Sequence, residues 1–187
     1  MKLTRIIFIT VLATVARFAL AANAAPLGLE LGVATQAQVR QQLDGQTELE
    51  EVGINQYSGG EMLKGDGEGL GIDGLSEIVF IFDTSDKLAA VLMTLPKGEG
   101  FGDLHSGNFT KTAKALAAKY KQVEKSQPFV GDARATFRQG DSVVELDAPH
   151  MSFTMTLRYM TQALQKTFKQ QSTSNKATKE RTQANKF

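Results

Sequence analysis

Two adjacent apolar segments near the middle of the chain constrain its fold more than any other feature. The segments, residues 77–83 and 88–95, are rich in strand-forming side chains and are separated by the turn-type tetrapeptide TSDK. This pattern predicts a β-hairpin. Because apolar residues occupy consecutive positions such as Ile78, Val79 and Phe80, we expect both strands to lie centrally in a sheet that is covered on both faces.

Amphipathic helices are predicted on both sides of the hairpin. Thr35 and Gln38 have the spacing of a capping box, and the apolar positions that follow predict a helix over residues 36–43. Apolar residues recur at intervals of three and four over residues 109–120, which predicts a second helix. A third helix is expected to begin near Met160, where an apolar residue recurs every four positions.

Short strands account for most of the remaining chain. We expect them at residues 49–54, 121–129, 133–138, 142–146 and 152–159, with a long Gly- and acid-rich loop between residues 47 and 74. In the last strand, Phe153, Met155, Leu157 and Tyr159 should point inward. The sum predicts an α+β fold, in which an antiparallel sheet carries two to three helices packed mainly on one face. A tandem αβββ repeat is one interpretation of the order in which the predicted helices and strands follow one another along the chain.

The N-terminal segment has the form of a signal peptide. Lys2 and Arg5 precede an apolar run over residues 6–16, which is shorter than the roughly 20 residues needed to span a bilayer. Small residues then allow cleavage after Ala24, which we favour, or after Ala21. We therefore expect residues 1–24 to be removed and the mature protein to be periplasmic or secreted, with no transmembrane segment.

Composition limits the remaining chemistry. The chain has no Cys, which excludes disulfides, thiolate nucleophiles, cysteine metal sites and a lipidated N-terminal Cys. The net charge of +1 gives no sign of nucleic-acid binding. It conceals an acidic body, because residues 162–187 carry a net charge of +5 and residues 25–161 one of −7. We expect a single domain over residues 25–169, followed by a disordered basic polar tail over residues 170–187 that contacts an anionic envelope surface.

Three landmarks carry a resemblance to a known group of proteins. They are the opening PLGLELGVAT (residues 26–35) before a short helix, the segment AAKY (residues 117–120) before strands, and the closing LRY (residues 157–159). Together they resemble small bacterial periplasmic αβ-repeat domains. In outline the chain is similar to the domains of the outer-membrane assembly lipoprotein of the small-protein-A type and of β-lactamase inhibitor proteins. The resemblance implies a non-catalytic binding domain, although the lipidated Cys of the lipoprotein is missing.

An acidic loop near the hairpin has part of the spacing of a calcium-binding loop. Counted from Asp66, acidic residues occupy positions 1, 3 and 12 (Asp66, Glu68 and Glu77), with Gly at position 6. Leu70 takes the place of a required oxygen ligand, and a strand follows where a helix is needed. We therefore interpret the segment as a solvated acidic loop and predict no cofactor, with calcium as the alternative.

A second candidate lies before the last strand, where Asp147, His150 and Ser152 fall close together. A hydrolase would need these residues assembled as nucleophile, base and orienting acid, and no nucleophile elbow is present. A metal site in which Glu145, Asp147 and His150 are the ligands is a further alternative for this segment. We favour a turn-shaping role for His150.

The leading functional hypothesis is a non-catalytic binding, assembly or inhibitor module that recognises another envelope protein. One alternative is a small-ligand carrier, with the Gly-rich segments 65–74 and 98–102 acting as lids over an apolar pocket. The other is a hydrolase that uses His150 and Asp147.

Overall fold

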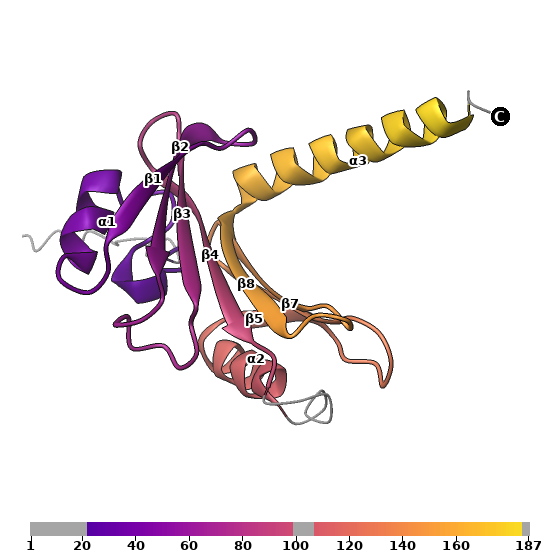
Figure 1. Cartoon of the computed structure of the whole chain (residues 1–187), viewed down its shortest axis with the longest axis horizontal. Coiled ribbons are helices and arrows are strands. Elements are labelled where there is room, and N and C mark those ends of the chain that lie inside the picture. The colour runs from indigo at the N-terminus through magenta and orange to yellow at the C-terminus, as the bar shows by residue number, and fades with distance from the viewer. Residues whose placement is uncertain (1–21, 99–106, 185–187) are drawn as a thin grey trace, which may run out of the picture.

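Eight antiparallel strands form one continuous sheet in the computed structural model, which describes residues 22–98 and 107–184 (Figure 1). The elements in chain order are the 3₁₀ turn η1 (Pro26–Gly28), α1 (Gln36–Leu43), β1 (Leu49–Ile54), β2 (Gly59–Asp66), β3 (Glu77–Asp83), β4 (Leu88–Pro96), α2 (Asn108–Lys119), β5 (Lys121–Ser126), β6 (Ala133–Gln139), β7 (Ser142–Ala148), β8 (Thr154–Thr161) and α3 (Gln162–Ala184). The α+β class and the antiparallel sheet are as predicted.

The strand order is β1-β2-β3-β4-β8-β7-β6-β5. Four strands follow α1 and four follow α2, and the last strand of each set pairs with the other at the centre, from Ala90 opposite Met160 to Pro96 opposite Thr154. The predicted hairpin is confirmed as β3 and β4. The capping box that begins α1 is also present, because the Thr35 hydroxyl accepts from the Gln38 amide and the Gln38 side chain accepts from the Thr35 amide.

One face of the sheet carries the main core, and we call it the helix-covered face. Phe80 and Leu157 on this face belong to the same buried cluster as Val39 and Leu43 of α1 and Leu116 of α2. The opposite face, which we call the open face, holds a smaller buried cluster of Ile81, Ala89, Ala90, Met160 and Leu164. The central hairpin is therefore covered on both sides where the first turns of α3 lie, as predicted, and the open face continues beyond α3.

The structure contains a strand, β2, where a loop was expected. Its Gly residues allow close strand approach, since a Cβ atom at Gly60 would lie 2.2 Å from the Phe82 carbonyl oxygen. Leu63 is fully buried opposite Phe80, so a single apolar side chain anchors β2 to the core. The predicted strand at residues 49–54 is confirmed as β1, but the long loop expected after it was wrong over residues 59–66, because backbone pairing outweighed the low strand propensity of Gly.

The C-terminal part also differs from its prediction. β8 continues through Thr161, so α3 begins at Gln162, two residues after the predicted start near Met160. Phe153 precedes β8 and is 68% exposed, whereas Met155, Leu157 and Tyr159 are buried as predicted. α3 runs through Ala184, where a disordered tail was expected from residue 170, and it extends away from the sheet (Figure 1). α3 is nucleated where Leu164 packs on the sheet, and extending an existing helix costs less than starting a new one.

Candidate functional site

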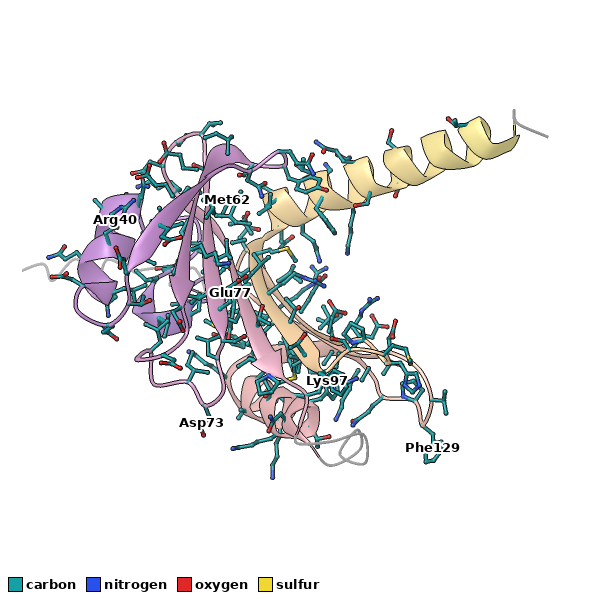
Figure 2. All side chains as sticks on the ribbon, in the orientation of Figure 1. Arg40, Met62, Asp73, Glu77, Lys97 and Phe129 are labelled. Atoms are coloured by element: carbon teal, nitrogen blue, oxygen red, sulfur yellow. The ribbon has the colours of Figure 1, made fainter. Side chains whose placement is uncertain are left out.

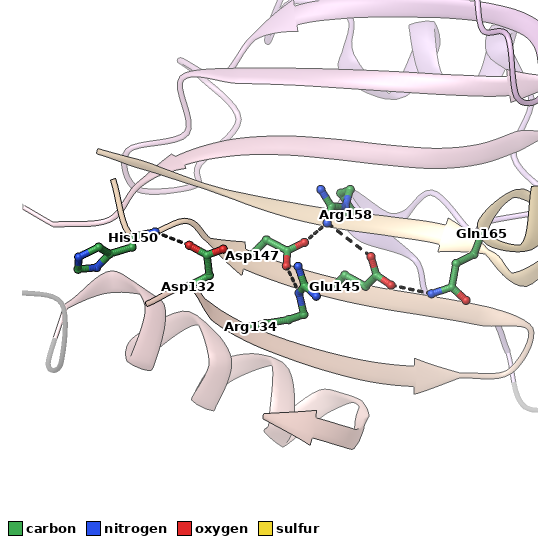
Figure 3. A network of polar contacts seen from close by, with 7 residues as sticks. All are labelled: Asp132, Arg134, Glu145, Asp147, His150, Arg158 and Gln165. Atoms are coloured by element: carbon green, nitrogen blue, oxygen red, sulfur yellow. Dashed lines mark hydrogen bonds and ion pairs between the residues drawn. The ribbon is translucent and has the colours of Figure 1, made fainter. Parts of the chain in front are cut away.

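The residues proposed for hydrolysis are not assembled into a catalytic group. Asp147 forms ion pairs with Arg134 and Arg158, and Figure 3 shows the His150 imidazole turned away from it. The Ser152 hydroxyl lies 3.1 Å from the Thr154 hydroxyl. No nucleophile–base contact joins Ser152, His150 and Asp147 in this part of the chain, so the geometry gives a hydrolase no support.

His150 contributes its backbone to the structure of the turn. Its amide donates a 2.8 Å hydrogen bond to the Asp132 carboxylate, which ties the 149–153 turn to the loop before β6 (Figure 3). The Lys97 ammonium, on a largely buried side chain, donates to the carbonyl oxygens of Pro149 and His150 at 2.5 and 3.3 Å. No local sequence pattern could indicate this role of Lys97, because its partners are backbone atoms more than 50 residues away.

A network of charged side chains crosses the open face on β6, β7, β8 and α3. Arg158 pairs with Asp147 and, at 3.5 Å, with Glu145, while Gln165 donates a 2.6 Å hydrogen bond to Glu145 (Figure 3). The side chains of Glu145, Asp147 and Arg158 are 17%, 12% and 29% exposed. The open face is therefore polar at its centre, and the charges there largely compensate one another.

The acidic loop residues are bound to neighbouring groups of the protein. Asp66 accepts a 2.9 Å hydrogen bond from the Glu68 amide, and Glu77 forms a 2.6 Å ion pair with Lys64. The hydrogen bond and the charge of Glu77 raise the pKa of Lys64. In the part of the chain that the structure describes, no three His, Asp or Glu side chains gather as a metal site would require, and this includes Asp66, Glu68 and Glu77 as well as Glu145, Asp147 and His150.

Four exposed apolar side chains lie on two loops, one before β6 and one before β8. We call them the loop cluster: Phe129 (82% exposed), Val130 (68%), Met151 (84%) and Phe153 (68%). The hydrogen bond between Asp132 and His150 joins the two loops, and Phe129 lies at the outer tip of the molecule (Figure 2). The sequence pattern that indicates the loop cluster is the presence of apolar residues in loop segments that contain Pro128, Gly131 and Pro149.

A groove with a cavity volume of about 500 Å³ lies beside α2 on the helix-covered face. We call it the α2 groove. Its floor consists of apolar side chains from β4 and β8, namely Met93, Leu95, Met155 and Leu157. Its walls are α2, the turn at Ile72–Gly74 and the η1 residues Pro26 and Leu27. One Gly-rich segment therefore does border an apolar pocket, while most of the other, residues 99–102, lies outside the described residues.

Two tyrosines close one end of the α2 groove. The rings of Tyr120 and Tyr159 lie edge to face, with centroids 6.1 Å apart. Burial raises the pKa of Tyr159, and the neighbouring Tyr120 raises it further. The Tyr120 hydroxyl is buried, and it interacts with the Tyr159 hydroxyl inside the fold.

Residues 22–24 are integrated into the folded domain. Ala24 is completely buried, and its amide donates to the Ser142 hydroxyl at 3.1 Å. The Asn23 side chain donates to the Leu31 carbonyl at 3.0 Å and accepts from the Asp141 amide at 2.7 Å. The expected signal segment before residue 22, including Ala21, lies outside the described residues.

None of the described helices combines the length and apolar character needed to cross a membrane. Comparison of the chain with known protein families, curated proteins and solved structures found no match.

Proposed function

We propose that this chain is an exported, non-catalytic binding module that recognises another envelope protein through the open face and the loop cluster. The observation that carries the proposal is the exposure of Phe129, Val130, Met151 and Phe153 on two linked loops. Contiguous exposed apolar side chains with polar surroundings are typical of protein interaction sites.

The open face supplies the polar part of this surface. Thr94 and Thr156 pair across β4 and β8 on the same side of the sheet as Arg158, which identifies them as open-face residues. The compensated charges of Arg158, Glu145 and Asp147 would orient a partner through hydrogen bonds, while the loop cluster supplies apolar contact.

The element order supports the proposed kinship with periplasmic αβ-repeat domains. One helix and four strands occur twice, and the mirrored strand order brings β4 and β8 together. We propose that the two halves are tandem units of one αββββ type, with α1 and α2 on the same face of the sheet.

The contacts of residues 22–24 bear on which peptide bond is cleaved when the protein is exported. Cleavage after Ala24 would remove the Asn23 side chain and the buried Ala24, and so break hydrogen bonds to Leu31, Asp141 and Ser142. Cleavage after Ala21 would keep them. We therefore favour a mature chain that begins at Ala22 and is located in the periplasm or outside the cell, where the basic residues after Gln162 contact an anionic envelope surface.

A matched pair of variants tests the proposed interaction surface. Phe129→Ser combined with Met151→Ser removes two members of the loop cluster, while Val33→Ser combined with Ile54→Ser removes exposed apolar side chains elsewhere. We expect an envelope protein to co-purify with the wild type and the Val33/Ile54 variant but not with the Phe129/Met151 variant. Equal recovery with both variants would contradict the proposal.

A further inference from the structure

The backbone of residues 22–24 is held by the domain in the way that a bound peptide is held. The Asn23 amide donates a 2.9 Å hydrogen bond to the Glu30 carboxylate, and the Ala22 carbonyl accepts one of 3.0 Å from the Gln139 side chain. These two contacts add to the side-chain bonds of Asn23 and to the burial of the residue that follows it. A chain end is usually poorly ordered unless it is tied down. The contacts therefore define a slot for this segment between Glu30 and the β6–β7 turn.

Glu30 brings to this slot a negative charge that no neighbouring side chain compensates. Its side chain is half-buried, and within residues 22–98 and 107–184 no Lys or Arg forms an ion pair with it. The hydrogen bond from the Asn23 amide comes from a neutral donor. Asp141, on the turn at the other side of Asn23, is exposed and adds a second negative charge. A cation placed in the slot would therefore meet favourable charge on both sides.

Hydrolysis of the peptide bond between Ala21 and Ala22 would supply such a cation. The reaction consumes one water molecule, leaves a carboxylate on Ala21 and converts the Ala22 amide nitrogen into an α-ammonium group, which is charged at neutral pH. The precursor has an uncharged amide at the same position. The charge thus exists only in the processed chain.

The new ammonium would lie close to the Glu30 carboxylate. The Ala22 nitrogen precedes the Asn23 nitrogen by one residue, at most about 3.6 Å, so it is within about 6.5 Å of Glu30 Oε1. Ala22 is exposed, and rotation about its ψ bond moves the nitrogen while the carbonyl stays on Gln139. A direct N–H to carboxylate hydrogen bond is therefore within reach, and a charged pair of this kind is stronger than a neutral one.

We propose that Glu30 is the binding site for the α-ammonium group of the processed chain, so that cleavage after Ala21 stabilises the folded domain. The inference rests on the proposed cleavage site and adds a consequence for folding. The bond that releases the signal segment also creates the charge that fixes the new N-terminus. Cleavage after Ala24 would remove both the ammonium and the segment that positions it.

Urea unfolding of two forms of the mature chain tests the ion pair. Both forms begin at Ala22 after release from a cleavable fusion, and one is then acetylated at the α-amine alone, which removes the charge. At neutral pH we expect acetylation to raise the unfolding equilibrium constant about fivefold, and the difference to shrink in about 1 M sodium chloride. Equal unfolding of the two forms would overturn the inference.

A matched pair of variants identifies the carboxylate. Glu30→Gln removes the charge but keeps an oxygen that can accept from the Asn23 amide, so acetylation should change its unfolding constant less than about twofold. Glu48→Gln, at an exposed acidic position before β1, should keep the fivefold effect. A fivefold effect that persists in Glu30→Gln, or one that disappears in Glu48→Gln, would contradict the assignment. Because the fusion sets the N-terminus, the result does not depend on where the chain is cleaved in the cell or on any protein partner.

Discussion

Tyr120, directly after α2, and Tyr159, in the central strand β8, meet edge to face with their ring planes at 73° and their centroids 6.1 Å apart. The contact joins the second helix to the middle of the sheet and forms one end of the α2 groove. Burial raises the pKa of Tyr159, because ionising a phenol inside the fold is unfavourable.

The first prediction concerns alkaline stability. The raised pKa of Tyr159 means that the folded protein holds the phenol proton above pH 10, where an unfolded tyrosine releases it. This contribution to stability is fully present below about pH 10 and is lost as the pH rises further. We expect Tyr159→Phe to make the fall in unfolding free energy above pH 10 shallower, by up to about 1.4 kcal/mol per pH unit. Urea unfolding at pH 8, 10 and 11 measures the slope, and an identical slope in both proteins would refute the assignment.

A second prediction concerns the ion network on the open face. Removing the Arg158 side chain leaves Glu145 and Asp147 close together with one less cation, and both carboxylates are largely buried. Arg158→Ala should lower the free energy of unfolding by about 2 kcal/mol. This loss lies between those typical of surface and of buried ion pairs, because the Arg158 side chain is 29% exposed. Arg138→Ala, an exposed arginine on β6, should change stability by less than about 0.5 kcal/mol. Equal losses in the two variants, measured by urea unfolding, would show that the network contributes nothing.

A third prediction concerns the N-terminus. If the exported chain is processed as its folded contacts require, its intact mass should correspond to a first residue of Ala22. Asn23→Ala should then destabilise the mature protein by about 1–2 kcal/mol, since it removes two side-chain hydrogen bonds to Leu31 and Asp141. A mass that begins at Ala25 would instead support the cleavage site that the sequence pattern alone favoured.

Local sequence patterns anticipated the elements whose cause is local. The capping box at Thr35 places the start of α1, and the apolar runs around residues 84–87 place the central hairpin. The alternation in β8 correctly predicted that Met155 and Leu157 are buried. These features depend on residues within a few positions of one another, which is the range over which periodicity is informative.

The features that the sequence did not reveal depend on distant residues. β2 forms because Gly60 allows the approach of Phe82 and Leu63 reaches the core. The α2 groove requires α2, β8 and the Asp73 turn to meet in space. Asp147 lies three residues before His150 in the chain, yet its carboxylate is held by Arg134 and Arg158 from neighbouring strands. These contacts from distant residues are the reason that the hydrolase alternative has no support in the geometry.

Site-specific photo-crosslinking tests the central claim most directly. A photoreactive phenylalanine analogue is placed at Phe129 or Met151 in the loop cluster, at Arg134 on the open face, or at Val33 as an exposed control near α1. The proteins are expressed in cells that export them and are irradiated before lysis. The account predicts one protein adduct of the same mass from the positions at 129, 151 and 134, and none from position 33. Adducts of equal yield at position 33, or no adduct at the loop cluster, would contradict it.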